Sequence, residues 1–125
     1  MIVGTGVDII EIDRIQKSIE QYGEKFLMKI YTQTEVDYCS TKADKYRRYA
    51  ARFAIKEAVY KAVMKYDHTI AWKDISVKND SDGAPQLEEL DKLAALGAQG
   101  IIIHVSLSHS NNYAVATAIA EKVAG

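Results

Sequence analysis

The side chains of Glu57 and Lys61 put an acid and a base four residues apart, a spacing that could serve acid–base or phosphate chemistry. If this stretch is helical, one face carries Ala50, Ala54, Glu57, Lys61 and Met64. We expect that face to be buried because its other members are apolar, and a buried Glu and Lys need partners. The alternative is a solvated surface pair, which contributes a few tenths of a kcal/mol. The spacing alone leaves both interpretations open.

A second acid, Asp8, lies in the segment 2–12, which is rich in Ile and Val and predicts a strand that ends in a loop. Alternation along a strand puts Asp8 on the same face as Gly4 and Gly6. Glycine in a strand often marks a place where another group approaches the backbone closely. Asp8 taken alone is more typical of a helix cap or turn, and a role in a site is the alternative.

Two carboxylates without a cluster of thiols or histidines suit a hard cation such as Mg²⁺, which completes its coordination with phosphate oxygens and waters. A nearby lysine adds a point charge for phosphate and a proton donor. Ser106 and His109 offer hydrogen bonds to a phosphorylated ligand, although His109 taken alone is more typical of a turn. A serine hydrolase fits poorly because the chain has no Gly-x-Ser-x-Gly motif, and it has no Walker loop. The residues indicate a Mg²⁺-dependent, phosphate-handling site without identifying a substrate.

The elements that must position these residues follow from periodicity and turn residues. We expect strands at 2–12, 73–78, 101–107 and 113–121, and helices at 14–22, 35–40, 46–65 and 87–96. The expected N-caps are Asp13 and Thr34, and the expected helix ends are Gly23 and Gly97. Residues 110–112 suit a tight antiparallel hairpin. The last strand is apolar on both faces, so we expect both faces to be covered in a mixed α/β (α+β) fold.

Length and composition restrict the class of protein. A chain of 125 residues suits a single domain, residues 1–125, with one core. A formal net charge of −1 argues against a general nucleic-acid-binding protein. No apolar run is long enough to span a membrane, and the first residues lack the pattern of a signal peptide. The single cysteine, Cys39, has no disulfide partner, so we expect a cytoplasmic protein.

Three stretches of the chain resemble the holo-(acyl carrier protein) synthases, the short bacterial type of 4′-phosphopantetheinyl transferase. They are residues 4–15 (GTGVDIIEIDRI), 52–62 (RFAIKEAVYKA) and 105–110 (VSLSHS), accompanied by the Gly83-Ala84-Pro85 turn. The resemblance runs from residue 2 to about residue 121, in the order and spacing of that family. It implies the family's fold, with a mainly antiparallel sheet packed against helices. It also implies a homotrimer whose strands pack about the three-fold axis, with sites at subunit boundaries.

The resemblance implies a reaction in fatty acid biosynthesis. Coenzyme A and apo acyl carrier protein would give holo acyl carrier protein and adenosine 3′,5′-bisphosphate. Asp8 and Glu57 would hold Mg²⁺ on the pyrophosphate of coenzyme A, with Lys61 near the phosphates. The positions that match the coenzyme A site are Arg52, Gly83, Pro85, Ser106 and His109.

The resemblance further implies a docking surface for the carrier protein. Arg14 matches a basic residue that meets the acidic recognition helix of the carrier. Glu24 stands where relatives often carry a basic residue, so we expect docking to differ in detail. The locally basic stretch 42–48 could compensate for that difference.

For this reaction we expect Glu57 to remove the proton of the attacking serine, directly or through a water. Lys61 would neutralise or protonate the leaving phosphate, and Asp8 would only hold the metal. One alternative is a coenzyme A or nucleotide-binding module without turnover, and another is a structural trimer in which Glu57 and Lys61 merely pair. The sequence identifies neither the carrier protein nor whether acyl-coenzyme A or Mn²⁺ is accepted.

Overall fold

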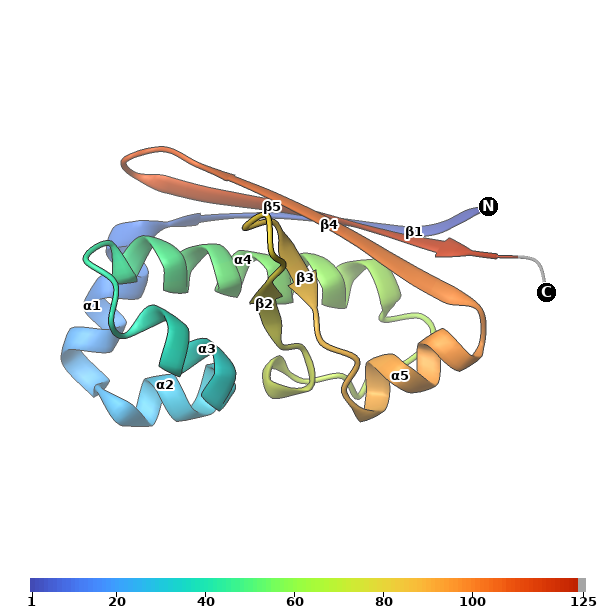
Figure 1. The fold of residues 1–125 in the computed structure, drawn as a ribbon, viewed down its shortest axis with the longest axis horizontal. Coiled ribbons are helices and arrows are strands. Elements are labelled where there is room, and N and C mark those ends of the chain that lie inside the picture. Colours follow the sequence, from blue (N-terminus) through green and yellow to red (C-terminus); the bar gives the residue numbers. More distant parts are fainter. Residues whose placement is uncertain (124–125) are drawn as a thin grey trace.

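Helix α4 (Lys45–Val63) lies in the middle of the molecule, between a sheet on one side and shorter helices on the other, and a small hairpin crosses it (Figure 1). The computed structural model describes residues 1–123. In chain order the other elements are β1 (Ile2–Glu11), α1 (Ile12–Tyr22), α2 (Glu24–Ile30), α3 (Gln33–Cys39), the 3₁₀ turn η1 (Trp72–Asp74), β2 (Val77–Asn79), β3 (Pro85–Leu87), α5 (Asp91–Ala98), β4 (Ile101–His109) and β5 (Tyr113–Lys122).

The larger sheet has three antiparallel strands in the order β1-β5-β4, so β1 and β4 are its two edges. Asp8 on β1 and Leu107 on β4 both pair in register with Ala116 of the central strand. Strands β2 and β3 form a separate two-stranded antiparallel sheet. The predicted α+β fold, with an antiparallel sheet packed against helices, is confirmed.

The glycines of β1 allow α4 to pack directly against the backbone of that strand. A Cβ atom added at Gly4 would lie 1.9 Å from the carbonyl oxygen of Ala62, and one added at Gly6 would lie 1.9 Å from that of Ala58. Both distances are far below van der Waals contact, so any side chain here would push the helix away. The predicted close approach at these glycines is confirmed, and it brings Asp8, on the same face, to the side of α4.

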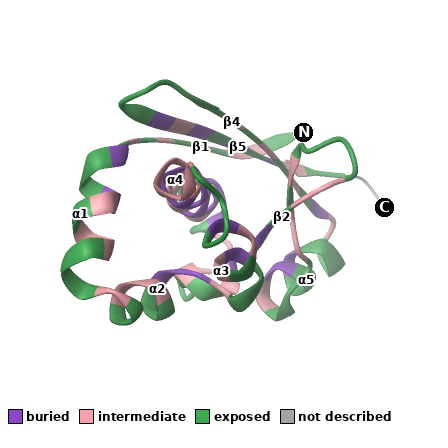
Figure 2. Ribbon diagram, turned by 60° about the vertical axis from the view of Figure 1, so that its left-hand side comes forward, coloured by how far each residue is buried: buried purple, intermediate pink, exposed green. Residues whose placement is uncertain are grey.

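Helix α4 is buried over most of its surface because packed layers lie on both sides of it (Figure 2). The predicted buried face is right only for its first half, where Ala50 and Ala54 are fully buried. Lys61 and Met64, in the second half, are exposed. That end of the face turns toward the open edge of β1, where Lys61 Nζ donates a hydrogen bond to the carbonyl oxygen of Val7 at 3.0 Å.

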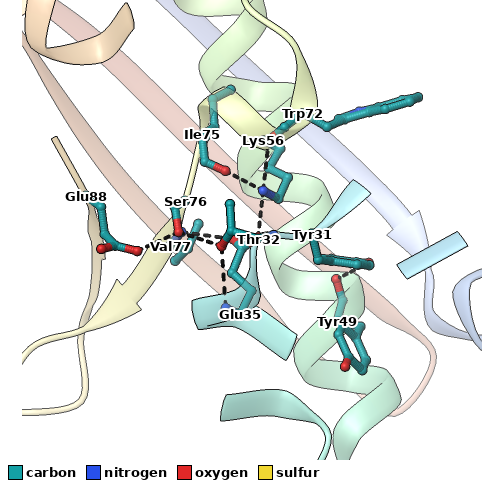
Figure 3. A network of polar contacts seen from close by, with 10 residues as sticks. All are labelled: Tyr31, Thr32, Glu35, Tyr49, Lys56, Trp72, Ile75, Ser76, Val77 and Glu88. Atoms are coloured by element: carbon teal, nitrogen blue, oxygen red, sulfur yellow. Dashed lines mark hydrogen bonds and ion pairs between the residues drawn. The ribbon is translucent and has the colours of Figure 1, made fainter. Parts of the chain in front are cut away.

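The fully buried charged pair joins different residues, Glu35 on α3 and Lys56 on α4. Glu35 Oε1 and Lys56 Nζ lie 2.7 Å apart, and neither side chain is exposed. Backbone groups complete the bonding (Figure 3): the carboxylate accepts the N–H groups of Thr32 and Val77, and the ammonium donates to the carbonyl oxygens of Trp72 and Ile75. Burial lowers the pKa of Lys56, and the negative charge of Glu35 opposes that shift.

Several predicted element ends are wrong for local reasons. The N-cap of α3 is Thr32, not Thr34, because Thr32 and Glu35 form a reciprocal capping box. Helix α1 begins without a side-chain cap, and Asp13 lies within its first turn. Gly97 is inside α5 rather than at its end. Gly23 does end α1, with a φ of 57° that few other residues adopt.

The expected elements between α4 and β4 also differ from those observed. Residues 72–79 form a 3₁₀ turn and a short strand rather than one strand over 73–78, although Ile75 and Val77 point inward as predicted. Leu87 belongs to β3, so the helix begins at Asp91 instead.

The face of the sheet turned away from α4 carries several exposed apolar side chains among polar ones, and none of the elements within residues 1–123 covers it. On β5, the alanines face α4 and are buried, while Tyr113 and Ile119 on the other face are exposed. Val7 and Ile9 on β1 continue this surface and are 58% and 63% exposed. The expectation that both faces of the last strand are covered is therefore wrong for one chain alone. None of the helices within residues 1–123 combines the length and apolar character needed to cross a membrane.

Candidate functional site

Strand β1 and helix α4 bring Asp8 and Lys61 together at the open edge of the sheet. Lys61 Nζ lies 3.4 Å from Asp8 Oδ1, and the same ammonium donates to the carbonyl oxygen of Val7. The Lys61 side chain is 48% exposed and the Asp8 side chain 18%. The pair is long and open to solvent on one side, so a ligand can reach both charges.

Partial burial raises the pKa of the Asp8 carboxyl above its usual range. The hydrogen bond and positive charge of Lys61 oppose this rise, and the negative charge of Glu57 adds to it. The negative charge of Glu57 thus disfavours ionisation of Asp8, and a bound cation would favour it.

Glu57 has a different partner from the one its spacing suggests. Its Oε1 accepts a hydrogen bond of 2.6 Å from the indole Nε1 of Trp72. Across residues 1–123, no ion pair joins Glu57 to Lys61. The interpretation in which these two residues merely pair with each other is therefore wrong for this chain.

The donor set suits a hard cation that shares its coordination with a ligand. Within the described part of the chain, no group of three His, Cys, Asp or Glu side chains surrounds a common point. Asp8 and Glu57 thus offer two carboxylates, which is the number Mg²⁺ commonly takes from a protein when phosphate oxygens and waters supply the rest. The residues fit a magnesium ion bound together with a phosphorylated ligand and do not fit a closed all-protein metal site.

A cavity of about 170 Å³ at the other edge of the sheet gathers the second group of predicted residues. Its lining is Asp44, Arg47, Arg48, Ala51, Arg52, Asn79, Gly83, Pro85, Leu107 and His109. Four of the five predicted coenzyme A residues are among these, namely Arg52, Gly83, Pro85 and His109. Three guanidinium groups face a single carboxylate there, so the cavity carries an excess of positive charge. Planar, always-charged guanidinium groups are well suited to phosphate.

The arginines of this cavity are only partly satisfied. Arg48 donates to Asp44 at 2.7 Å and to the hydroxyl of Tyr38 at 2.8 Å. Arg52 Nε is buried and lacks a hydrogen-bond partner within residues 1–123, and its Nη2 reaches Asn79 only at 3.5 Å. A buried donor without a partner is costly, so an anion in this cavity would gain from it.

The sequence matches the model of a known protein family. A family model described as the 4′-phosphopantetheinyl transferase superfamily matches residues 4–118. The chain belongs to this superfamily. A holo-[acyl-carrier-protein] synthase of Koribacter versatilis is 44% identical over 124 residues, which cover 97% of this chain and 99% of that protein. The family predicted from the sequence is confirmed.

Solved structures extend the match to three dimensions. A holo-(acyl-carrier-protein) synthase of Bacillus anthracis in complex with CoA (3′,5′-ADP) is 36% identical and has a TM-score of 0.79, with 98% of this chain and 99% of that chain covered. A holo-[acyl-carrier-protein] synthase of Helicobacter pylori in complex with coenzyme A is 28% identical with a TM-score of 0.80, covering 94% of this chain and 99% of that chain.

Two predicted site residues of this transferase lie away from both groups. Ser106 alternates with Leu107 along β4, so it points to the uncovered face of the sheet, where its Oγ lies 3.4 Å from Thr117 Oγ1. Arg14 is exposed on α1, and Glu24 is exposed at the start of α2.

The cavity near His109 and the carboxylates near Lys61 are separate within one chain, because they lie at opposite edges of the sheet.

Sequence reasoning missed Trp72, Arg47, Arg48 and Asn79 as individual site residues. The basic character of 42–48 was the available signal for the two arginines. The bond between Trp72 and Glu57 had no signal, because it joins a helix to a single 3₁₀ turn, which is too short to show periodicity.

Proposed function

We propose that this transferase moves the 4′-phosphopantetheine group from coenzyme A to a serine of apo acyl carrier protein and releases adenosine 3′,5′-bisphosphate. The observation that carries the proposal is the contact between Asp8 on β1 and Lys61 on α4 at one open edge of the sheet, one helical turn along α4 from Glu57. Relatives named as holo-[acyl-carrier-protein] synthases support it, as do their complexes with coenzyme A.

Asp8 and Glu57 would hold Mg²⁺. When bound, the ion would screen the pyrophosphate charge and stabilise the charge that develops in the transition state. Asp8 contributes a carboxylate fixed on a strand, while Glu57 accepts the proton of the attacking serine hydroxyl through a water, because one of its oxygens already accepts from Trp72 and the other would face the metal. Lys61 Nζ, 3.4 Å from Asp8, neutralises or protonates the leaving phosphate.

The arginine-lined cavity would bind the phosphates and adenosine of coenzyme A. Arg52 and His109 would contact phosphate oxygens, with Arg47 and Arg48 adding positive charge. Gly83 and Pro85 would form the wall of the cavity, and Gly83 has a positive φ of 87° that favours glycine. Ser106 would contact the ligand from the uncovered face of the sheet, where a neighbouring chain would pack in the proposed trimer.

A homotrimer would combine the two halves of the site. The carboxylates lie at the β1 edge and the cavity at the β4 edge, so a head-to-tail contact between copies would bring one of each together. The exposed apolar side chains on the uncovered face of the sheet supply a surface for that contact. A sedimentation mass equal to a single chain would contradict the trimer.

Mixing two inactive variants tests the shared site. Asp8→Asn and Arg52→Ala chains, unfolded and refolded together, should regain about a quarter of the wild-type activity, because some boundaries then combine two intact halves. Recovery no greater than that of each variant refolded alone would mean that the site lies within one chain.

Arg14 would dock the carrier protein through its acidic helix. Arg14→Glu should weaken carrier binding about tenfold at low salt, and the difference should shrink as salt rises because exposed charges are screened. Lys17→Glu on the same helix is a matched control for charge, since Lys17 is already paired with Asp13 at 2.8 Å. An unchanged affinity for the Arg14 variant would remove it from the interface.

The free, buried Cys39 is compatible with a reducing cytoplasm and so with fatty acid biosynthesis there.

Mass spectrometry of apo acyl carrier protein incubated with the protein, coenzyme A and Mg²⁺ tests the function. The carrier should gain the mass of one phosphopantetheine group, and a chelator should abolish the gain. A carrier of unchanged mass, despite bound coenzyme A, would contradict the proposal and indicate a binding module without turnover.

A further inference from the structure

Trp72, the only tryptophan of the chain, contacts one oxygen of Glu57 and leaves the other available. Its indole Nε1 donates to Oε1 at 2.6 Å. No hydrogen bond or ion pair within residues 1–123 involves Oε2. The indole ring is itself packed near Phe53, with 6.2 Å between the ring centroids.

The backbone of Trp72 is fixed by the residue that precedes Glu57. Lys56 Nζ donates to the carbonyl oxygen of Trp72 at 2.9 Å and to that of Ile75 (Figure 3). Glu35 holds the same ammonium and also accepts the N–H of Val77 at 2.9 Å. Consecutive residues of α4 therefore bind the two ends of Trp72, its carbonyl group through Lys56 and its indole through Glu57.

We propose that Trp72 is a positioning residue that restricts Glu57 to a single metal-binding oxygen, Oε2, and keeps its carboxylate away from Lys61. The buried pair of Glu35 and Lys56 holds Trp72 in the place where it can do so. This inference rests on the proposed function, because it takes Glu57 to be a metal ligand.

The restriction matters because a glutamate side chain has three rotatable bonds and Mg²⁺ requires near-octahedral geometry. An unrestrained Glu57 could turn toward the ammonium of Lys61, four residues along the same helix. Hydrogen bonds that orient a metal ligand are typically worth about 10–100-fold in metal affinity or activity. The indole N–H is a neutral donor, so it orients the carboxylate without competing for its charge.

Trp72→Phe tests the proposal because it keeps an aromatic ring and removes the N–H. With coenzyme A present, the dissociation constant for Mn²⁺, followed by electron paramagnetic resonance, should rise about 10–100-fold. The loading rate should fall and then recover as the Mg²⁺ concentration is raised, which a general structural defect would not do. Tyr60→Phe is the matched control, since it removes a donor to the carbonyl oxygen of His68 in the same region and leaves the bond between Trp72 and Glu57 in place.

Wild-type fluorescence gives a second readout that needs no variant at Trp72. Mn²⁺ should quench the emission of this single tryptophan, and Glu57→Gln should abolish the quenching at the same concentration. Wild-type Mn²⁺ affinity in Trp72→Phe, with the affinity lost in Glu57→Gln, would overturn this inference and leave the proposed function intact. Wild-type affinity in Glu57→Gln would overturn both.

Discussion

Lys56 and Glu57 are neighbours on α4 but belong to regions with opposite properties. Lys56 lies in a closed network, where its 2.7 Å salt bridge to Glu35 has no exposed side-chain surface. Glu57 lies beside an open group in which Asp8 and Lys61 are 3.4 Å apart and partly exposed. The first region has little left to bind, whereas the second leaves carboxylate oxygens and an ammonium available to a ligand.

This difference separates residues that maintain the fold from residues that do chemistry. A buried charge is tolerated only when ion-pair and hydrogen-bond partners surround it. Loss of any partner in the Glu35–Lys56 network should therefore destabilise the fold. A binding site needs polar or charged groups whose partners the ligand supplies. In the free protein these groups lower the stability of the fold. The partial burial that raises the pKa of Asp8 is one such cost, and the buried Nε of Arg52, which lacks a partner within residues 1–123, is another.

The largest effect on stability should follow the loss of Lys56. Lys56→Met leaves the Glu35 carboxylate buried without a counter-charge, and we expect the free energy of unfolding to fall by about 3–5 kcal/mol. Chemical denaturation measures this change. The double variant with Glu35→Gln should lose less than the sum of the two single variants. Strict additivity would mean that the two groups do not depend on each other.

Replacing Lys61 should affect activity strongly and stability only weakly, unlike the replacement of Lys56. In Lys61→Met we expect the free energy of unfolding to change by no more than about 1 kcal/mol, because a half-exposed ion pair contributes little. The loading rate should nevertheless fall by about 100-fold, since the leaving phosphate loses its nearest cation. A stability loss as large as that of Lys56→Met would show that the two regions are not distinct.

Asp8→Asn should have the smallest effect on stability, and in the opposite direction. A raised pKa means that the folded state holds the proton more strongly than the unfolded chain, so ionised Asp8 lowers stability at pH 7. That cost is absent below the usual carboxyl range near 3.8 and appears as the pH rises through the raised folded-state pKa. In a chelator at pH 7, Tm should rise by about 1–4 °C, as measured by calorimetry. A clear fall in Tm would show that Asp8 is a stabilising residue.

Much of this arrangement could be predicted from the sequence. The β-rich segments, the long helix and the glycines of β1 have local signals, so β1, β4, β5 and α4 were expected close to their observed positions. Asp8 and Lys61 meet because those elements pack as glycine spacing requires.

The remaining features depend on contacts between residues far apart in the chain. Helix α4 is covered on both sides, so no amphipathic stripe distinguishes the buried Lys56 from the half-buried Glu57. Glu35 is on another helix, and Trp72 is in the short 3₁₀ turn η1, so their bonds to α4 have no periodic signature. Ser106 was assigned to the coenzyme A site by resemblance, whereas strand alternation turns it to the other face of the sheet.

The most direct test of the central claim is the initial rate at which Glu57→Gln loads apo acyl carrier protein at saturating Mg²⁺. Glu89→Gln is the control, because Glu89 is an exposed acid outside both regions. We predict a loss of at least about 100-fold for Glu57→Gln, with wild-type rates for the control and Tm within about 4 °C of the wild type for both variants. A Glu57→Gln protein that loads the carrier at the wild-type rate would contradict the account.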